Sequence, residues 1–216
     1  MQKKVAILGA SGLIGNQLLN LLIKDQEITQ IIVLNRSALQ YSDPKILQHT
    51  GQLQQINSEM LEGIDALYCC IGTTRKKSPD QNVYRSIDYG ITLQIANTAK
   101  NAGIPEVHLI SAMGANLQSR IFYNRLKAEI ERDLLLLQFN RTLIYQPALL
   151  IGARTEKRTG EKFAQWISPL LDLLLFGKAR RFHSIQAQDL AKAMRMHSFQ
   201  SGIFQKTITY LDFFKP

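Results

Sequence analysis

The chain has few cysteines and no long apolar run. Cys69 and Cys70 are the only cysteines among 216 residues, and adjacent cysteines rarely bridge each other, so we interpret them as reduced core residues. No stretch reaches the roughly 18 apolar residues of a membrane span. Two lysines before the first apolar run imitate a secretion signal, but glycines interrupt that run. A cytoplasmic protein is therefore expected.

Acidic residues are outnumbered, which gives a net charge of +9. Residues 151–216 hold 11 Lys or Arg against 5 Asp or Glu, so the excess is concentrated there. No dense basic run is interleaved with aromatic side chains. This pattern favours a solvated surface or an anionic ligand over nucleic acid as a partner.

Short apolar runs alternate with helical patterns in the first 150 residues. Residues 4–8, 31–35, 65–71, 106–111 and 141–147 are predicted strands, and 53–56 is a weaker one. The predicted helices are residues 13–24, 81–102 and 120–138. This alternation indicates an α/β fold, a doubly wound parallel sheet of the Rossmann type.

Residues 148–216 follow a different pattern. They contain a charged loop at 152–162, then a predicted helix at 161–175, strand at 181–185, helix at 187–198 and terminal strand within 204–214. This is little chain for an independent core. We therefore expect a single domain in which 148–216 closes one side of a cleft. Trp166 and the apolar run 169–176 are expected in the core, with a substrate wall or a dimer contact as alternatives.

Three glycines separate the first strand from the first helix. In "VAILGASGLIG", Gly9 permits a tight turn, Gly12 allows a pyrophosphate to approach the backbone, and Gly15 allows close helix packing. The spacing differs from the G-x-G-x-x-G of many dehydrogenases. The predicted cofactor contacts at this junction also include Ser11, Leu13 and Ile14. The alternative is a glycine-rich turn without a ligand.

The residues after the second strand bear on the choice of cofactor. An acidic side chain here would accept hydrogen bonds from a free ribose 2′-hydroxyl, but Asn35 and Arg36 occupy the positions. A guanidinium suits a 2′-phosphate. NADP (NADPH) is therefore favoured over NAD, unless Arg36 is only a solvated charge.

A further set of predicted cofactor contacts follows the next buried strand. Gly72 would let the chain turn past the cofactor, and Thr73 and Thr74 offer hydroxyl and amide groups at the edge where ligands bind in open sheets. A simple turn is the alternative. The backbone from Pro147 to Ile151 is expected to line the nicotinamide.

Three residues form a candidate catalytic set. Ser111 ends the predicted strand 106–111, Tyr123 lies near the start of the following helix, and Lys127 is one turn further on. Tyr123 would exchange a proton with a substrate oxygen. For this exchange to occur near neutral pH, a nearby cation must lower the pKa of the phenol. Lys127 would supply that cation and could also hold the nicotinamide ribose. Ser111 would hydrogen-bond the substrate carbonyl. A tyrosine and a lysine on a solvated helix face are the alternative.

These motifs together resemble the short-chain dehydrogenase/reductase superfamily, whose Ser and Tyr-x-x-x-Lys residues match Ser111, Tyr123 and Lys127 in type, order and context. The segments "GASGLIG", "CCIGTTR", "SAMGA", "YNRLKAEIE" and "GARTEKRTGE" are similar to its atypical branch, which includes the Tat-interacting oxidoreductase-like proteins. The resemblance implies an NADP-binding fold and says less about substrate. Related sequences often have Arg where Gln146 stands, and a neutral amide weakens an anion contact there.

Two other polar residues receive structural interpretations. Asp88 is expected to make a structural hydrogen bond, with the positioning of a neighbouring loop as the alternative. His183 has no acids or histidines at metal-ligand spacing, so no metal site is expected.

The leading functional hypothesis is an NADP(H)-dependent oxidoreductase acting on a small-molecule carbonyl or alcohol. One alternative is an NADP(H)-sensing module, in which the cofactor orders the loop 152–162 for a protein partner. The other is an enzyme similar to nucleotide-sugar epimerases, although residues 148–216 leave little room for a sugar-nucleotide pocket. A monomer and a homodimer both fit the sequence, and the substrate is open.

Overall fold

The structure is a computed structural model that describes residues 2–73, 78–151, 183–200, 202 and 204–215. Several predicted features lie outside these residues. They are Thr74, the charged loop 152–162, the helix 161–175, Trp166, the apolar run 169–176 and the start of the strand 181–185.

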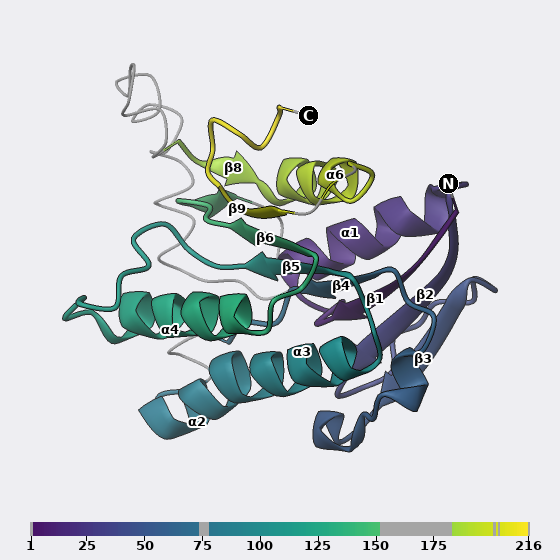
Figure 1. Ribbon diagram of the computed structural model, residues 1–216, viewed down its shortest axis with the longest axis horizontal. Helices are drawn as coiled ribbons and strands as arrows, with labels where there is room; N and C mark the ends of the chain where they lie inside the picture. The colour runs from purple at the N-terminus through teal and green to yellow at the C-terminus, as the bar shows by residue number, and fades with distance from the viewer. Residues whose placement is uncertain (1, 74–77, 152–182, 201, 203, 216) are drawn as a thin grey trace.

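The described part of the chain is built on one seven-stranded parallel sheet with the order β3-β2-β1-β4-β5-β6-β9 (Figure 1). Its strands are β1 (Lys3–Leu8), β2 (Ile28–Asn35), β3 (Ile46–Thr50), β4 (Ala66–Cys69), β5 (Glu106–Ile110), β6 (Arg141–Tyr145) and β9 (Phe204–Ile208). The order reverses direction beside β1. This confirms the predicted doubly wound α/β fold, in which ligands bind beyond the carboxyl ends of the strands.

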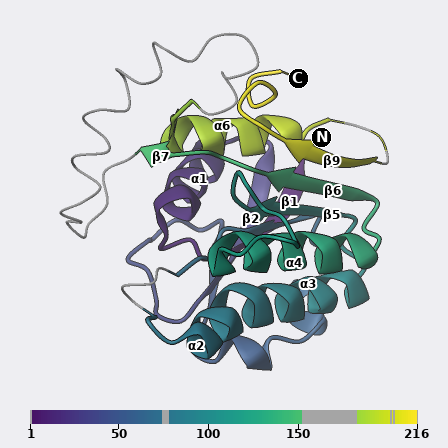
Figure 2. The same cartoon turned by 90° about the vertical axis from the view of Figure 1, so that its left-hand side faces the viewer.

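Helices cover both faces of the sheet (Figures 1 and 2). On one face lie α1 (Leu13–Lys24) and α6 (Ala187–His197), and on the other lie α2 (Gln81–Arg85), α3 (Thr92–Asn101) and α4 (Phe122–Leu136). The buried side chains form two clusters, one for each face. Because both faces are covered, β4 and the buried parts of β1 and β2 are continuously apolar instead of alternating, apart from Asn35 at the end of β2. The strands β5 and β6 also bury polar side chains, namely Glu106, His108, Arg141 and Thr142.

The first helix forms where its apolar residues recur on one face. Its buried side chains recur at helical spacing and pack against one face of the sheet; they are Ile14, Leu18, Leu19 and Leu22. Gly12 precedes the helix in an extended conformation and provides no side-chain cap. The first N–H groups of α1 therefore keep their capacity to bind an external acceptor.

The predicted helix 81–102 is nearly continuous but contains a wide turn. Asp80 caps its start by accepting hydrogen bonds from the amides of Asn82 and Val83. Residues Ser86–Ile91 then form a π-helical turn between α2 and α3. Such turns insert one extra residue into a helix and often occur at functional sites. Here the turn contains Asp88, whose side chain is buried.

The predicted strand at 53–56 is wrong. Residues Leu53–Gln55 form a single 3₁₀ turn, held by Leu53, which is buried. The edge strand is instead β3, a segment with polar Gln48 and His49 that shows only weak apolar alternation. This segment is a strand because its main chain pairs with β2, and its side-chain pattern contributes less.

A small two-stranded sheet flanks the main one. It pairs β7 (Leu150–Ile151) with β8 (Ile185–Gln186), so only the end of the predicted strand 181–185 is seen as a strand. The predicted helix 187–198 and the terminal strand are confirmed as α6 and β9, and β9 extends the main sheet beside β6.

Gly15→Ala should destabilise the fold. A Cβ atom at position 15 would lie 2.3 Å from the carbonyl oxygen of Gly9, so the turn before α1 must move. We expect the free energy of unfolding to fall by about 1–3 kcal/mol, measured by urea denaturation. Gly90→Ala is the control, because its Cβ would come no closer than 4.0 Å to its nearest neighbour. Equal stability of the two variants would contradict the close packing described for Gly15.

Candidate active site

The turn between β1 and α1 is tight because it passes against the end of β4. Gly9 has a φ of +87°, and a Cβ there would lie 2.8 Å from the amide nitrogen of Ile71. The Gly12 amide donates to the Gly9 carbonyl at 3.0 Å. Ser11 is exposed, Leu13 is half-buried and Ile14 is buried at the start of α1. The turn thus presents backbone to the carboxyl edge of the sheet, a cradle that suits a pyrophosphate.

At the end of β2, a buried amide donor without a partner among the described residues lies next in sequence to an exposed arginine. Asn35 is 4% exposed, and its Nδ2 atom has no hydrogen-bond partner among the described residues. Arg36 is exposed. Two bonds between the Leu39 backbone and the Gln48 amide, of 2.8 and 2.9 Å, hold the loop that follows. A buried donor without a partner calls for an explanation, and a bound ligand would satisfy it.

The Asp88 side chain binds the loop after β4. The Thr73 amide donates to Asp88 Oδ1 at 2.6 Å, and the Tyr84 hydroxyl donates to the Thr73 carbonyl at 3.1 Å. The expected structural hydrogen bond of Asp88 is therefore confirmed, and it does position a loop. Gly72 is exposed, and a Cβ there would meet only Asp88 Oδ2 at 3.8 Å. The turn itself therefore does not require glycine at position 72.

Lys127 is a buried cation that is paired with Asp88. Its side chain is 6% exposed, and Nζ lies 3.2 Å from Asp88 Oδ2. The contact is an ion pair between the lysine ammonium and the Asp88 carboxylate. Burial alone would lower the pKa of Lys127, but the Asp88 carboxylate outweighs it and the pKa is raised. Lys127 is charged at neutral pH.

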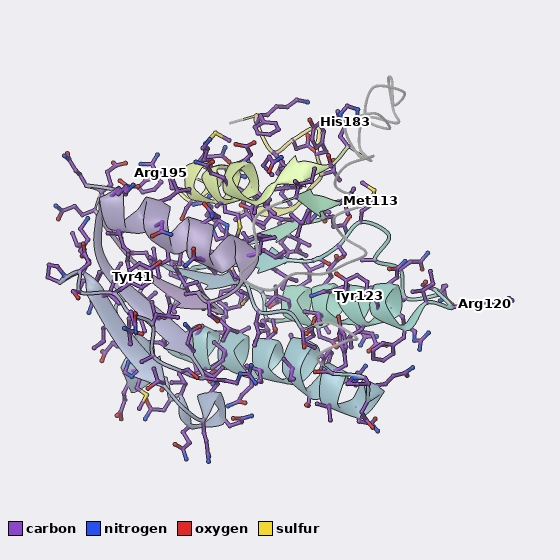
Figure 3. All side chains as sticks on the ribbon, turned by 180° about the vertical axis from the view of Figure 1, so that it is seen from behind. Tyr41, Met113, Arg120, Tyr123, His183 and Arg195 are labelled. Carbon is purple, nitrogen blue, oxygen red and sulfur yellow. The ribbon has the colours of Figure 1, made fainter. Side chains whose placement is uncertain are left out.

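Tyr123 lies one turn before Lys127 and is accessible. Its side chain is 39% exposed, and Lys127 Nζ lies 5.9 Å from the centroid of its ring. Figure 3 shows Tyr123 on the side of the molecule where Met113 and His183 also lie, with Arg120 at the outer tip of the preceding loop. The phenol is thus open to solvent while the cation beside it is not.

Ser111 is bound to Glu131 in this structure. Ser111 follows β5, is 3% exposed, and its hydroxyl donates a hydrogen bond to Glu131 Oε1. Gln146 Nε2 donates to both oxygens of the same carboxylate, at 2.9 and 3.1 Å. The amide at position 146 thus contacts an anion of the protein itself. Next to it, Pro147 is buried and its carbonyl accepts from the Met113 amide at 3.0 Å.

Two contacts were not foreseen from the sequence. Glu131 lies one turn beyond Lys127 and two turns beyond Tyr123, so the three side chains share one row of α4. That spacing is visible in the sequence and could have pointed to Glu131. The Asp88 partner of Lys127 could not be found this way, because it depends on how the π-helical turn packs against α4.

Cys69 and His183 both pack against other parts of the protein. Cys69 is buried, and burial raises the pKa of its thiol to about 12. His183 packs against Tyr210, with ring centroids 5.0 Å apart.

Within the described residues no group of three His, Cys, Asp or Glu side chains could hold a metal ion. In that same part of the chain, no helix has the length and apolarity needed to cross a membrane.

Asp88→Asn should destabilise the protein strongly, since it leaves Lys127 buried without a counter-charge. We expect a loss of about 3–5 kcal/mol in the free energy of unfolding at neutral pH, measured by urea denaturation. The raised pKa of Lys127 means that this stabilisation is fully present below the unfolded-state pKa of lysine. It is lost only as the pH rises through the higher folded-state value.

Asp189→Asn is the matched control for this substitution. Asp189 pairs with Lys192 at 3.1 Å, but both side chains are exposed. Its loss should change the free energy of unfolding by less than about 1 kcal/mol. If both substitutions had the same small effect, the Lys127–Asp88 pair would not be the buried constraint inferred here.

Sequence comparisons identify relatives over most of the chain. Residues 9–136 match a family model described as NAD(P)H-binding. The "Protein FMP52, mitochondrial" of Debaryomyces hansenii is 31% identical over 165 residues, which are 74% of this chain and 73% of that protein. "Protein HTATIP2" of Rattus norvegicus is 30% identical over 168 residues, which are 76% of this chain and 69% of that protein.

Solved structures with the same fold are more distant in sequence. A UDP-N-acetylglucosamine 4-epimerase from Methanobrevibacter ruminantium superposes with a TM-score of 0.73 at 14% identity, covering 96% of this chain and 76% of that one. MoeE5, solved with UDP-glucuronic acid and NAD, gives 0.72 at 16% identity, with 95% and 75% covered. At this identity the likeness concerns the fold. With the family match and the two relatives, it places the chain in the short-chain dehydrogenase/reductase superfamily, in the atypical branch of HTATIP2 and FMP52.

Proposed function

We propose that the protein is an NADP(H)-dependent oxidoreductase that interconverts a carbonyl and an alcohol. One observation carries the proposal: a continuous set of contacts links the glycine turn to Lys127. Gly9 packs on Ile71, the Thr73 amide binds Asp88, and Asp88 pairs with Lys127. A dinucleotide on the glycine turn would thus extend along the carboxyl edge of the sheet toward α4.

Each part of this edge suits one part of the cofactor. The glycine turn and the amides of Ser11, Leu13 and Ile14 would bind the pyrophosphate at the start of α1. Gly72, Thr73 and Thr74 would lie beside the middle of the cofactor. Pro147 and Lys127 would flank the nicotinamide and its ribose. When bound, the cofactor supplies or accepts the hydride.

Tyr123 and Lys127 would handle the proton. The phenol exchanges its proton with the substrate oxygen, and its exposure allows a substrate to reach it. The Lys127 cation stands beside it, and burial strengthens its field. Asp88 holds that cation in place and keeps it charged. Ser111 would complete the set as a hydrogen-bonding contact for the substrate.

Asn35 and Arg36 would favour NADPH over NADH. The guanidinium is exposed and unopposed by a carboxylate at position 35, and the orphan Asn35 amide is an additional donor at the same strand end. Both groups donate hydrogen bonds, and a 2′-phosphate is rich in acceptors.

The protein as a whole is proposed to act as a single domain. Residues 148–216 would close one side of the substrate cleft, as a monomer or a homodimer. We propose a cytoplasmic location; the FMP52 relatives are named as mitochondrial, so cell fractionation is the relevant test.

Arg36→Ala should weaken NADPH binding and leave NADH binding nearly unchanged. A charge-assisted hydrogen bond contributes about 1.5–3 kcal/mol, which corresponds to a loss of about ten- to hundredfold in NADPH affinity. Fluorescence titration of the reduced cofactors measures both dissociation constants. NADH in the same variant is the internal control. An equal loss for both cofactors would contradict a role in recognising the 2′-phosphate.

Tyr123→Phe should reduce turnover with little effect on NADPH affinity, since it removes only the exchangeable proton. Loss of a general acid typically reduces kcat by about 100- to 10,000-fold. NADPH oxidation with a panel of carbonyl compounds gives the rates. Unchanged turnover would eliminate Tyr123 as the proton donor. Tight NADPH binding by the wild-type protein without any turnover would favour the cofactor-sensing module instead.

A further inference from the structure

The single hydroxyl proton of Ser111 is already used in this structure. Glu131 is a carboxylate and can only accept, so the hydrogen bond between the two residues must carry the Ser111 proton. The Ser111 oxygen is left with lone pairs alone. The role expected from the sequence, donation to a substrate carbonyl, is not available to Ser111 in this arrangement.

The surroundings of Glu131 explain why this proton is held there. The carboxylate receives both of its Gln146 bonds from one neutral amide nitrogen. Lys127, one turn away on α4, has its Nζ 3.2 Å from Asp88 instead. Among the described residues, the hydrogen bonds to Glu131 come from two neutral donors, the Ser111 hydroxyl and the Gln146 amide, while the Lys127 charge also attracts the carboxylate. Releasing that proton would leave a carboxylate oxygen with weaker compensation.

We propose that Glu131 is a positioning residue that determines specificity: it fixes Ser111 as a hydrogen-bond acceptor, so that the site recognises the alcohol form of its substrate pair over the carbonyl form. This inference rests on the proposed function. A hydroxyl can donate to the Ser111 oxygen, whereas a carbonyl oxygen cannot. Of Ser111 and Tyr123, Tyr123 is then the residue that can donate to the carbonyl form.

Binding measurements test this without requiring turnover. The probes are 1-phenylethanol with NADPH and acetophenone with NADP⁺, because neither mixture can react. Calorimetry on the full chain gives the two dissociation constants and hence the preference for the alcohol.

Glu131→Leu removes the acceptor and frees the Ser111 hydroxyl to donate. The ketone should then bind about three- to tenfold more tightly, the size of one neutral hydrogen bond, while the alcohol should change little because it can still donate to the Ser111 oxygen. Ser111→Ala should weaken only the alcohol. A gain in ketone affinity cannot arise from a general loss of structure. Glu129→Leu is the matched control, because Glu129 is on the same helix but pairs with Arg85; it should leave the preference unchanged.

Three results would overturn the inference. They are a wild-type chain that fails to bind the alcohol, a wild-type preference for the ketone, and an unchanged preference in Glu131→Leu. If Glu131→Leu does not fold, Ser111→Ala tests the acceptor role by itself, because it should weaken the alcohol and leave the ketone unchanged; equal effects on both ligands would overturn the inference. The proposed function fails separately, if the chain binds cofactor and alcohol but shows no hydride transfer with any substrate.

Discussion

The buried charge of Lys127 is the constraint on which the rest of the site depends. A lysine ammonium that is 6% exposed requires a partner, and Asp88 provides one at 3.2 Å. To reach α4, Asp88 must face inward, and it lies in the π-helical turn between α2 and α3. The second oxygen of Asp88 binds the Thr73 amide. One ion pair therefore sets the relative positions of α4, the π-helical turn and the loop after β4.

Tyr123, Lys127 and Glu131 share one row of α4, but each has a different environment. Tyr123 is exposed, Lys127 is buried against Asp88, and Glu131 lies between Ser111 and Gln146. Because successive members are one turn apart, the helix places a phenol, a cation and a carboxylate along the edge where the strands end. The glycine turn after β1 lies at the carboxyl edge of the same sheet.

Much of the fold could be predicted from the sequence, because buried parallel strands and amphipathic helices have strong and different apolar periods. The helix Leu13–Lys24 agrees with its predicted bounds. The edge strand β3 was missed, since its exposed face and the polar Gln48 and His49 weaken the apolar signal. The segment at 53–56 was mistaken for a strand because a short apolar run does not distinguish a strand from a 3₁₀ turn.

The site was less predictable than the fold. Residue types and strand ends pointed to Ser111, Tyr123 and Lys127, but pairings across elements depend on packing that a sequence pattern does not contain. The bond from Ser111 to Glu131 changes the expected hydrogen-bonding role of the serine, although it leaves its place in the fold as expected. Likewise, Gln146 was seen as a weak contact for an external anion, whereas it supports an internal one.

A crystal structure with NADPH bound tests the central claim most directly, since the claim is that one edge of the sheet holds both the cofactor and the proton donor. The account predicts the 2′-phosphate at Arg36, the pyrophosphate at the turn after β1, and the nicotinamide ribose within hydrogen-bonding distance of Lys127. A nicotinamide ring directed away from α4, or a Lys127 that stays in contact with Asp88 alone, would contradict it.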